Sequence, residues 1–205
     1  IKGEPLVLLV DCAQADSIRL GIQHLSAPKG KDGFGGMEYP LHEGINVIYP
    51  QKDGLCYIIY QTDVPQEAPD AKIHIIGGHT NGYFDIEKHL YADGSSRWRE
   101  LLEKAGDQYF DVVSPYVHFT FNTSLLRKHV ADIVPLLEAY DTMVRHEQEF
   151  QGFRKYNRML ANRVYFYSSR ATYGGAWAKP YAIGYNEEFM INLLDANRFK
   201  TTECW

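Results

Sequence analysis

The sequence predicts an α+β fold, in which a β-rich N-terminal sheet or sandwich precedes a mixed α/β part. Two observations lead to this prediction. Up to about residue 80, short runs rich in Val, Ile, Leu and Tyr alternate with turns that contain Gly or Pro. From residue 95 onward, apolar residues also recur at helical spacing. We therefore divide the chain into a β-rich subdomain, 1–80, and a mixed α/β part, 81–205.

The strands of the first part are predicted from short runs of β-branched, leucine and tyrosine residues, which lie at 6–10, 18–25, 45–48, 55–61 and 73–76. Breakers such as Asp53-Gly54 predict turns between them. The glycines within residues 32–36 are not followed by the Lys-Ser/Thr pair of a phosphate-binding loop, so we interpret this segment as a flexible turn.

Two helices are predicted from apolar residues at helical spacing. The first has Ser95 or Ser96 available as its N-cap, and one face carries Trp98, Leu101, Leu102 and Ala105. The second begins after Asp132, has Pro135 in its first turn and ends near Gly152. Its apolar face consists of Leu136, Leu137, Tyr140, Met143 and Val144.

Shorter elements are predicted around these helices. Two strands are expected on either side of Pro115, from Val112, Val113, Val117, Phe119 and Phe121. Asn122 or Thr123 is expected to cap a helix that runs through His129. Residues 164–167 predict another strand, whereas 187–194 fit either a helix or a strand.

Composition excludes several classes of protein. The chain has 205 residues, of which 45% are hydrophobic and 23% charged, and this balance is typical of a folded soluble protein. The net charge is -5 and the Lys and Arg residues are scattered, so we expect no nucleic-acid partner. No apolar run approaches the ~20 residues of a membrane-spanning helix, so we expect no membrane span.

The three cysteines, Cys12, Cys56 and Cys204, are too few and too far apart for a disulfide framework or a paired-cysteine metal site. Free cysteine is among the most frequently buried residue types. We therefore expect buried free thiols at these positions.

Two His-Glu pairs, at residues 42–43 and 146–147, invite comparison with a zinc-binding helix. Such a helix needs a second histidine four residues after the first, because that spacing puts both imidazoles on one face. Asn46 and Phe150 stand at those positions, so neither pair fits. We expect residues 146–149 to be a solvated helix end, and we expect no metal ligand in this chain.

A second group of possible ligands lies within and after the run 73–76. Its members are the side chains of His74, His79, Asp85, Glu87 and His89. Their spacing matches no recognised ligand pattern, and we expect structural roles for them.

Five segments, taken in order, carry a resemblance to one family. They are Gly-Leu-Cys-Tyr-Ile-Ile-Tyr at 54–60, Lys-Ile-His-Ile-Ile-Gly-Gly at 72–78, Tyr-Phe-Asp at 83–85, Gly-Gly-Ala-Trp-Ala-Lys-Pro-Tyr-Ala-Ile-Gly-Tyr-Asn at 174–186 and Glu-Cys-Trp at 203–205. Each motif is weak alone, but their order and spacing resemble the enhancin-like zinc metallopeptidases, metallopeptidase family sixty. This family includes viral enhancins and bacterial mucin-degrading enzymes.

The resemblance implies that 81–205 is the mixed α/β part of an incomplete zincin-like peptidase domain. In the family, a Trp-Gly pair leads into H-E-x-x-H, whose histidines hold zinc and whose glutamate is the general base. Here Trp205 is the last residue, and Ile1 stands where an initiator methionine or signal peptide would. We therefore expect no catalytic residue in this chain, and zinc only in a complete parent domain. The resemblance also implies a secreted or cell-surface protein that acts on glycoproteins such as mucins.

By resemblance, residues 174–185 lie at the substrate cleft. Small residues on a sheet edge let a peptide backbone approach closely, and aromatic side chains can contact peptide or attached sugar. We therefore select Gly174, Gly175, Trp177 and Tyr181 as substrate-binding candidates. The alternative at this segment is that the two glycines form a turn and that Trp177 belongs to the core.

Two other functions remain open at this stage. A β-rich domain can use exposed aromatic residues to bind a glycan or a peptide without ever having carried a catalytic helix. The family scaffold can also persist as an inactive interaction domain. The residues that follow Trp205 in the parent reading frame separate these hypotheses, because only the enzyme requires Gly and H-E-x-x-H there.

Overall fold

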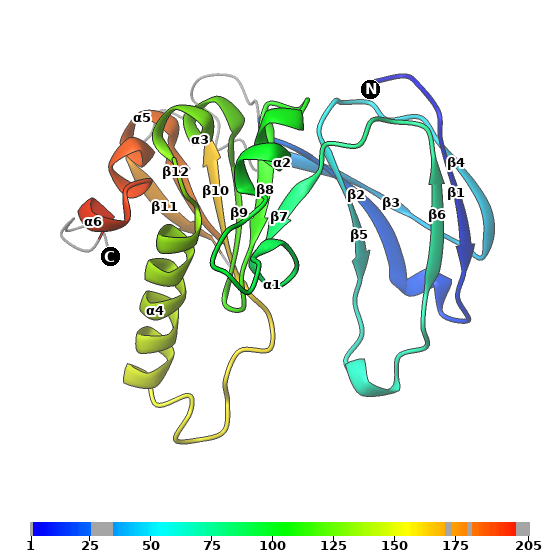
Figure 1. Cartoon of the computed structure of the whole chain (residues 1–205). Coiled ribbons are helices and arrows are strands. Elements are labelled where there is room, and N and C mark those ends of the chain that lie inside the picture. Colours follow the sequence, from blue (N-terminus) through cyan, green and yellow to red (C-terminus); the bar gives the residue numbers. More distant parts are fainter. Residues whose placement is uncertain (1, 26–34, 171–173, 180–181, 200–205) are drawn as a thin grey trace. The chain divides into compact units, whose positions relative to one another are not determined.

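A computed structural model describes residues 2–25, 35–170, 174–179 and 182–199 (Figure 1). Contacts divide these residues into two compact units, one made of 2–25 with 35–80 and one that begins at Asn81. The α+β prediction is confirmed, because a strand-rich first unit is followed by a second unit in which helices and strands alternate. Each unit is described by itself below.

The first unit is a sandwich of two antiparallel three-stranded sheets. One sheet has the order β4-β1-β6, from Gly44–Ile48, Leu6–Asp11 and Lys72–Ile76. The other has the order β3-β2-β5, from Gly35–Pro40, Ile18–His24 and Leu55–Tyr60. Short 3-10 turns lie at Ala15–Ser17 and Pro65–Glu67. Leu8 of β1 and Leu20 of β2 meet in one core, so the two sheets bury a common apolar layer.

Two expectations for this unit are wrong. The strand β3 begins at Gly35, inside the segment interpreted as a turn; its pairing with β2 opposes Gly36 and Gln23. Glycine suits this place because a Cβ on residue 36 would lie 3.1 Å from the Ile22 carbonyl oxygen. Cys56 is exposed rather than buried, because it lies on the edge strand β5, beyond the core of the sandwich. Cys12 is buried as expected, and Cys204 lies outside the described residues.

The second unit is built on a six-stranded mixed sheet of order β11-β12-β10-β9-β8-β7. Its strands are Ala176–Lys179, Ala182–Asn186, Val164–Ser169, Val117–Asn122, Tyr109–Val113 and Tyr83–Asp85. The central strand β10 is parallel to both β9 and β12, whereas β11 returns antiparallel to β12. In this order β11 forms one end of the sheet.

Six α-helices accompany this sheet in the described part of the chain. They are α1 (Ile86–His89), α2 (Trp98–Lys104), α3 (Thr123–His129), α4 (Val134–Phe150), α5 (Glu187–Met190) and α6 (Ala196–Phe199). A 3-10 turn, Ile191–Leu193, links the last two. The ambiguous segment 187–194 is therefore helical, and Asn186 fixes its start because its Oδ1 accepts a hydrogen bond of 2.8 Å from the Glu188 amide.

Helix ends follow local side-chain chemistry in most places. Asn122 caps α3 as predicted, since its Oδ1 accepts hydrogen bonds from the Ser124 and Leu125 amides. The predicted cap of α2 is confirmed only in part: the N-cap residue is Arg97, without a side-chain hydrogen bond, but the Ser96 hydroxyl accepts one of 3.4 Å from the Trp98 amide at the start of the helix. Ser95 instead bonds to Asp93, at 2.6 Å between the hydroxyl and the carboxylate. Competition from this local turn draws Ser95 away from the helix.

The core of the second unit lies between the sheet and its helices. Phe119 of β9 and Phe166 of β10 point to this side, where Tyr140 of α4 packs against both rings at centroid distances of 4.6 and 5.2 Å. Tyr140 also stacks on Phe199 of α6 at 3.9 Å. These contacts hold the longest helix across the sheet beside its central strands. No described helix is both long and apolar enough to cross a membrane.

Candidate functional site

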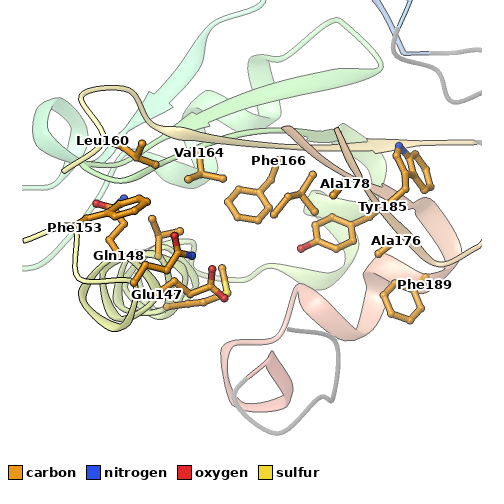
Figure 2. Close-up of a pocket in the computed structure, with 15 residues that line it drawn as sticks. Glu147, Gln148, Phe153, Leu160, Val164, Phe166, Ala176, Ala178, Tyr185 and Phe189 are labelled. Carbon is orange, nitrogen blue, oxygen red and sulfur yellow. The ribbon is translucent and has the colours of Figure 1, made fainter. Parts of the chain in front are cut away.

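An open apolar hollow lies on the helix side of the second unit, with a volume of about 470 Å3. It is bounded by α4, by the strands β10, β11 and β12, and by α5. Figure 2 shows Glu147, Gln148 and Phe153 at one end and Ala178, Tyr185 and Phe189 at the other, with Val164 and Phe166 between them. Its wall is therefore mainly hydrocarbon, as is typical of a surface that receives another apolar group.

Strand alternation explains which side chains enter the hollow. Ala176 and Ala178 are paired with Tyr185 and Ile183, so these four residues face the helices and contribute to its wall. The alanines leave space beside the larger partners on β12. At this edge of the sheet, the face that is turned toward the helices is therefore shallow and apolar.

One polar atom in this wall stands out. Gln148 is 5% exposed, and its Oε1 has no hydrogen-bond partner among the described residues. A buried carbonyl oxygen without a donor costs free energy. The hollow therefore presents one unsatisfied acceptor in a mainly apolar wall, which also includes Glu147 and Gln151.

Trp177 borders the hollow, but its indole lies on the other face of the sheet. Its partner across the ladder is Gly184, and a Cβ on that glycine would lie 2.3 Å from the indole nitrogen. The indole Nε1 donates a hydrogen bond of 2.7 Å to the Tyr167 hydroxyl. Trp177 is thus half-buried and held in a defined position by its neighbours.

The other predicted substrate-binding residues are separated by the structure. Gly174 has a φ of 101°, which places it at a turn just before β11. Gly175 is half-buried, and a Cβ there would lie 2.6 Å from Cδ2 of Phe189. Packing against the Phe189 ring is thus a reason for glycine at this position. Tyr181 lies outside the described residues. The substrate-binding role of all four residues stays a prediction.

Several residues of the hollow are absent from the sequence-based candidates. Gln148, Phe153 and Phe189 come from α4, from the loop after it and from α5, which are far apart in the sequence. Met143 and Val144 belong to the predicted apolar face of α4, and this periodicity is the one signal that points toward the hollow.

The candidate metal ligands have structural roles where contacts are defined. Asp85 caps α1 by accepting a hydrogen bond of 3.0 Å from the Glu87 amide, and His89 Nδ1 accepts one from the Asp85 amide. Asn46 binds the backbone of His42 through both its Oδ1 and its Nδ2. Within the described ranges, no three His, Cys, Asp or Glu side chains gather as a metal site.

Hydrogen bonds to one carboxylate link α4 to the turn between β8 and β9. The Asp141 carboxylate accepts a hydrogen bond of 2.6 Å from the Ser114 hydroxyl and one of 3.1 Å from the Tyr116 amide. Burial raises the pKa of Asp141, and the two hydrogen bonds oppose this shift. This contact fixes α4 beside the start of β9, on the same side of the sheet as the hollow.

Comparison with solved structures shows what this arrangement resembles. A metallopeptidase from Bacteroides thetaiotaomicron matches with a TM-score of 0.80 over 99% of this chain, at 24% sequence identity. A metallopeptidase in complex with Tn antigen matches with a TM-score of 0.81 over 98%, also at 24% identity. The M60 catalytic domain of Clostridium perfringens ZmpC, in complex with the sialyl T antigen, matches with a TM-score of 0.75 over 95%, at 15% identity.

The chain has the fold of these metallopeptidases. Residues of both units take part in the match, since it covers 99% and 98% of this chain. The chain spans 35%, 38% and 43% of the lengths of the three similar proteins. No protein-family model matches the sequence, and no curated protein matches it.

Proposed function

We propose that this chain is the scaffold and substrate-cleft part of a zinc metallopeptidase that acts on glycoproteins such as mucins, outside the cell or at its surface. The observation that carries this proposal is the match to the Bacteroides metallopeptidase, with a TM-score of 0.80 over 99% of the chain. The Tn and sialyl T antigens bound by two similar proteins support a substrate that carries glycans.

The sheet edge suits the substrate side of such a cleft. An extended peptide can add as a strand to the exposed edge of a sheet, where main-chain hydrogen bonds provide affinity. The strand β11 is the terminal strand in the order of the described sheet. In this proposal the substrate runs along β11, so that Gly174, Gly175 and Trp177 lie beside it.

In this proposal the apolar hollow does not bind the substrate but receives a helix from another part of the protein. Its apolar wall, formed by α4 and the β10–β12 strands, is a surface against which a helix can pack. The similar proteins are more than twice as long as this chain, and in our proposal the helix with H-E-x-x-H comes from the remaining part. A donor from that helix would satisfy Gln148 Oε1.

Zinc enters this proposal only with that remaining part. No described His, Cys, Asp or Glu residues form a cluster that fits the ion. We therefore assign no ligand and no catalytic step to this chain. Its own residues would position the substrate and support the catalytic helix.

The proposal is tested with the longer protein that contains this sequence. We expect about one zinc per molecule and cleavage of an O-glycosylated mucin peptide, lost with a chelator and restored by added zinc. Mass spectrometry of the peptide before and after incubation measures cleavage. If the longer protein binds the glycopeptide without cutting it, the non-catalytic glycan- or peptide-binding module is the better description. If it neither binds nor cuts, the proposed substrate class is wrong.

A further inference from the structure

The charge of this chain is unevenly distributed along its sequence. No Asp or Glu occurs between Glu149 and Glu187, although the whole chain has a net charge of -5. The connection between α4 and β10, residues 151–163, carries Arg154, Lys155 and Arg158 within five positions and ends on Arg163. We refer to residues 151–163 as the basic loop. Its four cations leave a formal charge of about -9 on the rest of the chain.

The basic loop has a defined backbone. Figure 1 shows it, in yellow, running beyond the end of α4 before it returns to β10. The Phe153 amide donates a hydrogen bond of 2.9 Å to the Gln148 carbonyl, and the Arg158 amide donates one of 2.7 Å to the Phe153 carbonyl. The side chains of Phe153 and Leu160 form part of the hollow. These contacts fix the loop, so little conformational entropy is lost when its cations bind a ligand.

Aromatic side chains are exposed next to these cations. Phe150, at the end of α4, is 95% exposed, and Tyr156 is 66% exposed. The Lys155 ammonium lies 5.4 Å from the centre of the Tyr156 ring. An accessible aromatic face and a positive charge are therefore presented together, which is an arrangement suited to a ligand with both apolar and anionic parts.

Existing ion pairs leave most of this charge available. Arg154 pairs with Glu149 at 3.6 Å, but both side chains are substantially exposed, at 68% and 39%. Pairs of this kind are weak. Within the part of the chain that the structure describes, Arg158 pairs with no carboxylate.

Stabilisation of α4 explains only part of the pattern. Cations near a helix C-terminus interact favourably with its dipole, but this effect falls off within the last turn. The helix ends at Phe150, and Arg158 lies well beyond that turn, whereas the Arg163 guanidinium donates a hydrogen bond to the Ser114 carbonyl. The dipole also gives no reason for exposed aromatic rings at Phe150 and Tyr156.

We propose that the basic loop binds an acidic oligosaccharide, one whose sugars carry carboxylates. The planar guanidinium of Arg154 or Arg158 can bind a carboxylate with two parallel hydrogen bonds. The apolar faces of a sugar ring can pack on Phe150 or Tyr156. This inference rests on the proposed function, because it names the charge class of the glycoprotein that the protein would recognise.

An anionic membrane surface is the main competing partner. A membrane is flat and wide, so it would also meet the exposed carboxylates of Glu147 and Glu149 in the last turn of α4, next to the loop. A short oligosaccharide would contact the loop alone. Charge complementarity therefore favours the oligosaccharide.

The test measures binding by the chain 1–205, which requires no peptidase activity. The probes are a sialylated O-glycopeptide immobilised on a biosensor, the same glycopeptide after sialidase treatment, and vesicles of phosphatidylcholine with phosphatidylserine. We expect the sialylated probe to bind about tenfold more tightly than the treated one at about 0.05 M salt, and this preference to shrink at about 0.3 M.

Two triple variants decide whether the loop is responsible. Arg154→Gln, Lys155→Gln and Arg158→Gln together should remove the preference, whereas Lys2→Gln, Lys52→Gln and Lys72→Gln, exposed positions of the first unit, should retain it. Thermal unfolding of both variants should match the unchanged chain, since all six side chains are exposed. Equal loss in both variants, an unchanged preference in the loop variant, or tighter binding to the vesicles would overturn the proposal.

The outcome is independent of catalysis. If the longer protein proves inactive as a peptidase but the basic loop still selects the sialylated probe, the loop assignment holds and the proposed function fails. If the peptidase cleaves sialylated and desialylated glycopeptides alike and the unchanged chain 1–205 binds both probes equally, the proposed function holds and the loop assignment fails.

Discussion

The indole of Trp177 lies over Gly184 and donates a hydrogen bond of 2.7 Å to the Tyr167 hydroxyl. Three neighbouring strands, β11, β12 and β10, are joined by this arrangement on the face opposite the helices. It explains why a tryptophan occurs on an edge strand beside alanines. The bulky ring is accommodated because the residue facing it has no side chain.

Replacing Gly184 with alanine should displace this indole, since the new Cβ would lie 2.3 Å from the ring nitrogen. We expect a loss of about 1–3 kcal/mol in the free energy of unfolding, together with a shift in tryptophan fluorescence. Gly106→Ala is the matched control, because a Cβ there meets nothing within 4 Å. Equal stability of the two variants would contradict the close packing of Trp177.

A side chain at Gly175 should act through Phe189. Gly175→Val places its Cβ 2.6 Å from Cδ2 of that ring, so we expect about 1–3 kcal/mol of destabilisation in thermal unfolding. In the background Phe189→Ala the same substitution should cost less, and the difference is the coupling energy between the two residues.

The same pair of variants separates packing from substrate approach. If Gly175 admits the substrate backbone, Gly175→Val lowers peptidase turnover of the longer protein in both backgrounds. If glycine serves only to accommodate Phe189, turnover recovers when Phe189 is shortened. The role of this position in the cleft can therefore be measured apart from its role in stability.

The hydrogen bonds accepted by Asp141 should contribute to stability in a way that depends on substitution and on pH. Asp141→Ala leaves the Ser114 hydroxyl and the Tyr116 amide without their acceptor, so a loss of about 2–3 kcal/mol is expected. Asp141→Asn keeps one acceptor oxygen and should cost less. Chemical denaturation of the three proteins at pH 7 gives this ranking.

The pH dependence follows from the direction of the pKa shift. Burial raises the pKa of Asp141 in the folded state, so the folded state binds a proton more tightly than the unfolded state. The stability contributed by this group is present below the unfolded pKa and is lost as pH rises through the folded pKa. The unfolding free energy of the unchanged chain, relative to Asp141→Asn, should therefore fall as pH rises above about 4. A constant difference would show that Asp141 titrates as it does in the unfolded chain.

The cap of α3 provides a local test of stability. Asn122→Ala removes the side-chain oxygen that accepts hydrogen bonds from the backbone amides of Ser124 and Leu125. It also removes the side-chain nitrogen that donates a hydrogen bond of 3.0 Å to the Glu187 carboxylate. We expect about 1–2 kcal/mol of destabilisation, measured by denaturant unfolding. Asn122→Asp keeps the capping oxygen but loses the donor to Glu187 and should be intermediate. Equal values for the two variants would show that the cap contributes little.

The hollow predicts a difference between the chain alone and the longer protein. Because its wall is apolar and open, the chain 1–205 should bind the dye ANS with increased fluorescence. In the longer protein, a helix packed there should reduce this signal severalfold. Ala178→Glu, which puts a charge into the wall, should lower ANS binding by the chain. Equal dye binding by both proteins would contradict a covered hollow.

Local chemistry explains which parts of the fold could be predicted. The strand β1 and the helices α3 and α4 carry their own signals, namely apolar runs, the Asn122 cap and Pro135 in a first turn. The strand β3 has no such signal, since its Gly-Gly-Met-Glu-Tyr-Pro sequence becomes a strand through pairing with β2. The strand β7, only Tyr83–Asp85, is likewise defined by its pairing with β8.

The hollow was beyond prediction for a related reason. Its wall combines α4, the basic loop, three strands and α5, and no single segment shows a hydrophobic period that marks such a junction. Gln148 belongs to the helix end that was predicted to be solvated, 146–149, and the prediction is wrong for this residue, which is buried, whereas the other three residues are exposed. The edge position of β11, in contrast, agrees with the small residues read from the sequence.

The parallel pairing of β10 with β9 has a consequence for synthesis of the chain. Because α4 and the basic loop lie between these strands, roughly 50 residues must leave the ribosome after β9 before β10 can cover its edge. At ordinary translation rates this takes roughly 2–10 s. Throughout that interval the edge of β9 that will face β10 stays unpaired, although β8 is already available to pair with its other edge. Chaperone binding to the nascent chain should therefore be strongest between the emergence of Phe119 and Phe121 and that of Phe166.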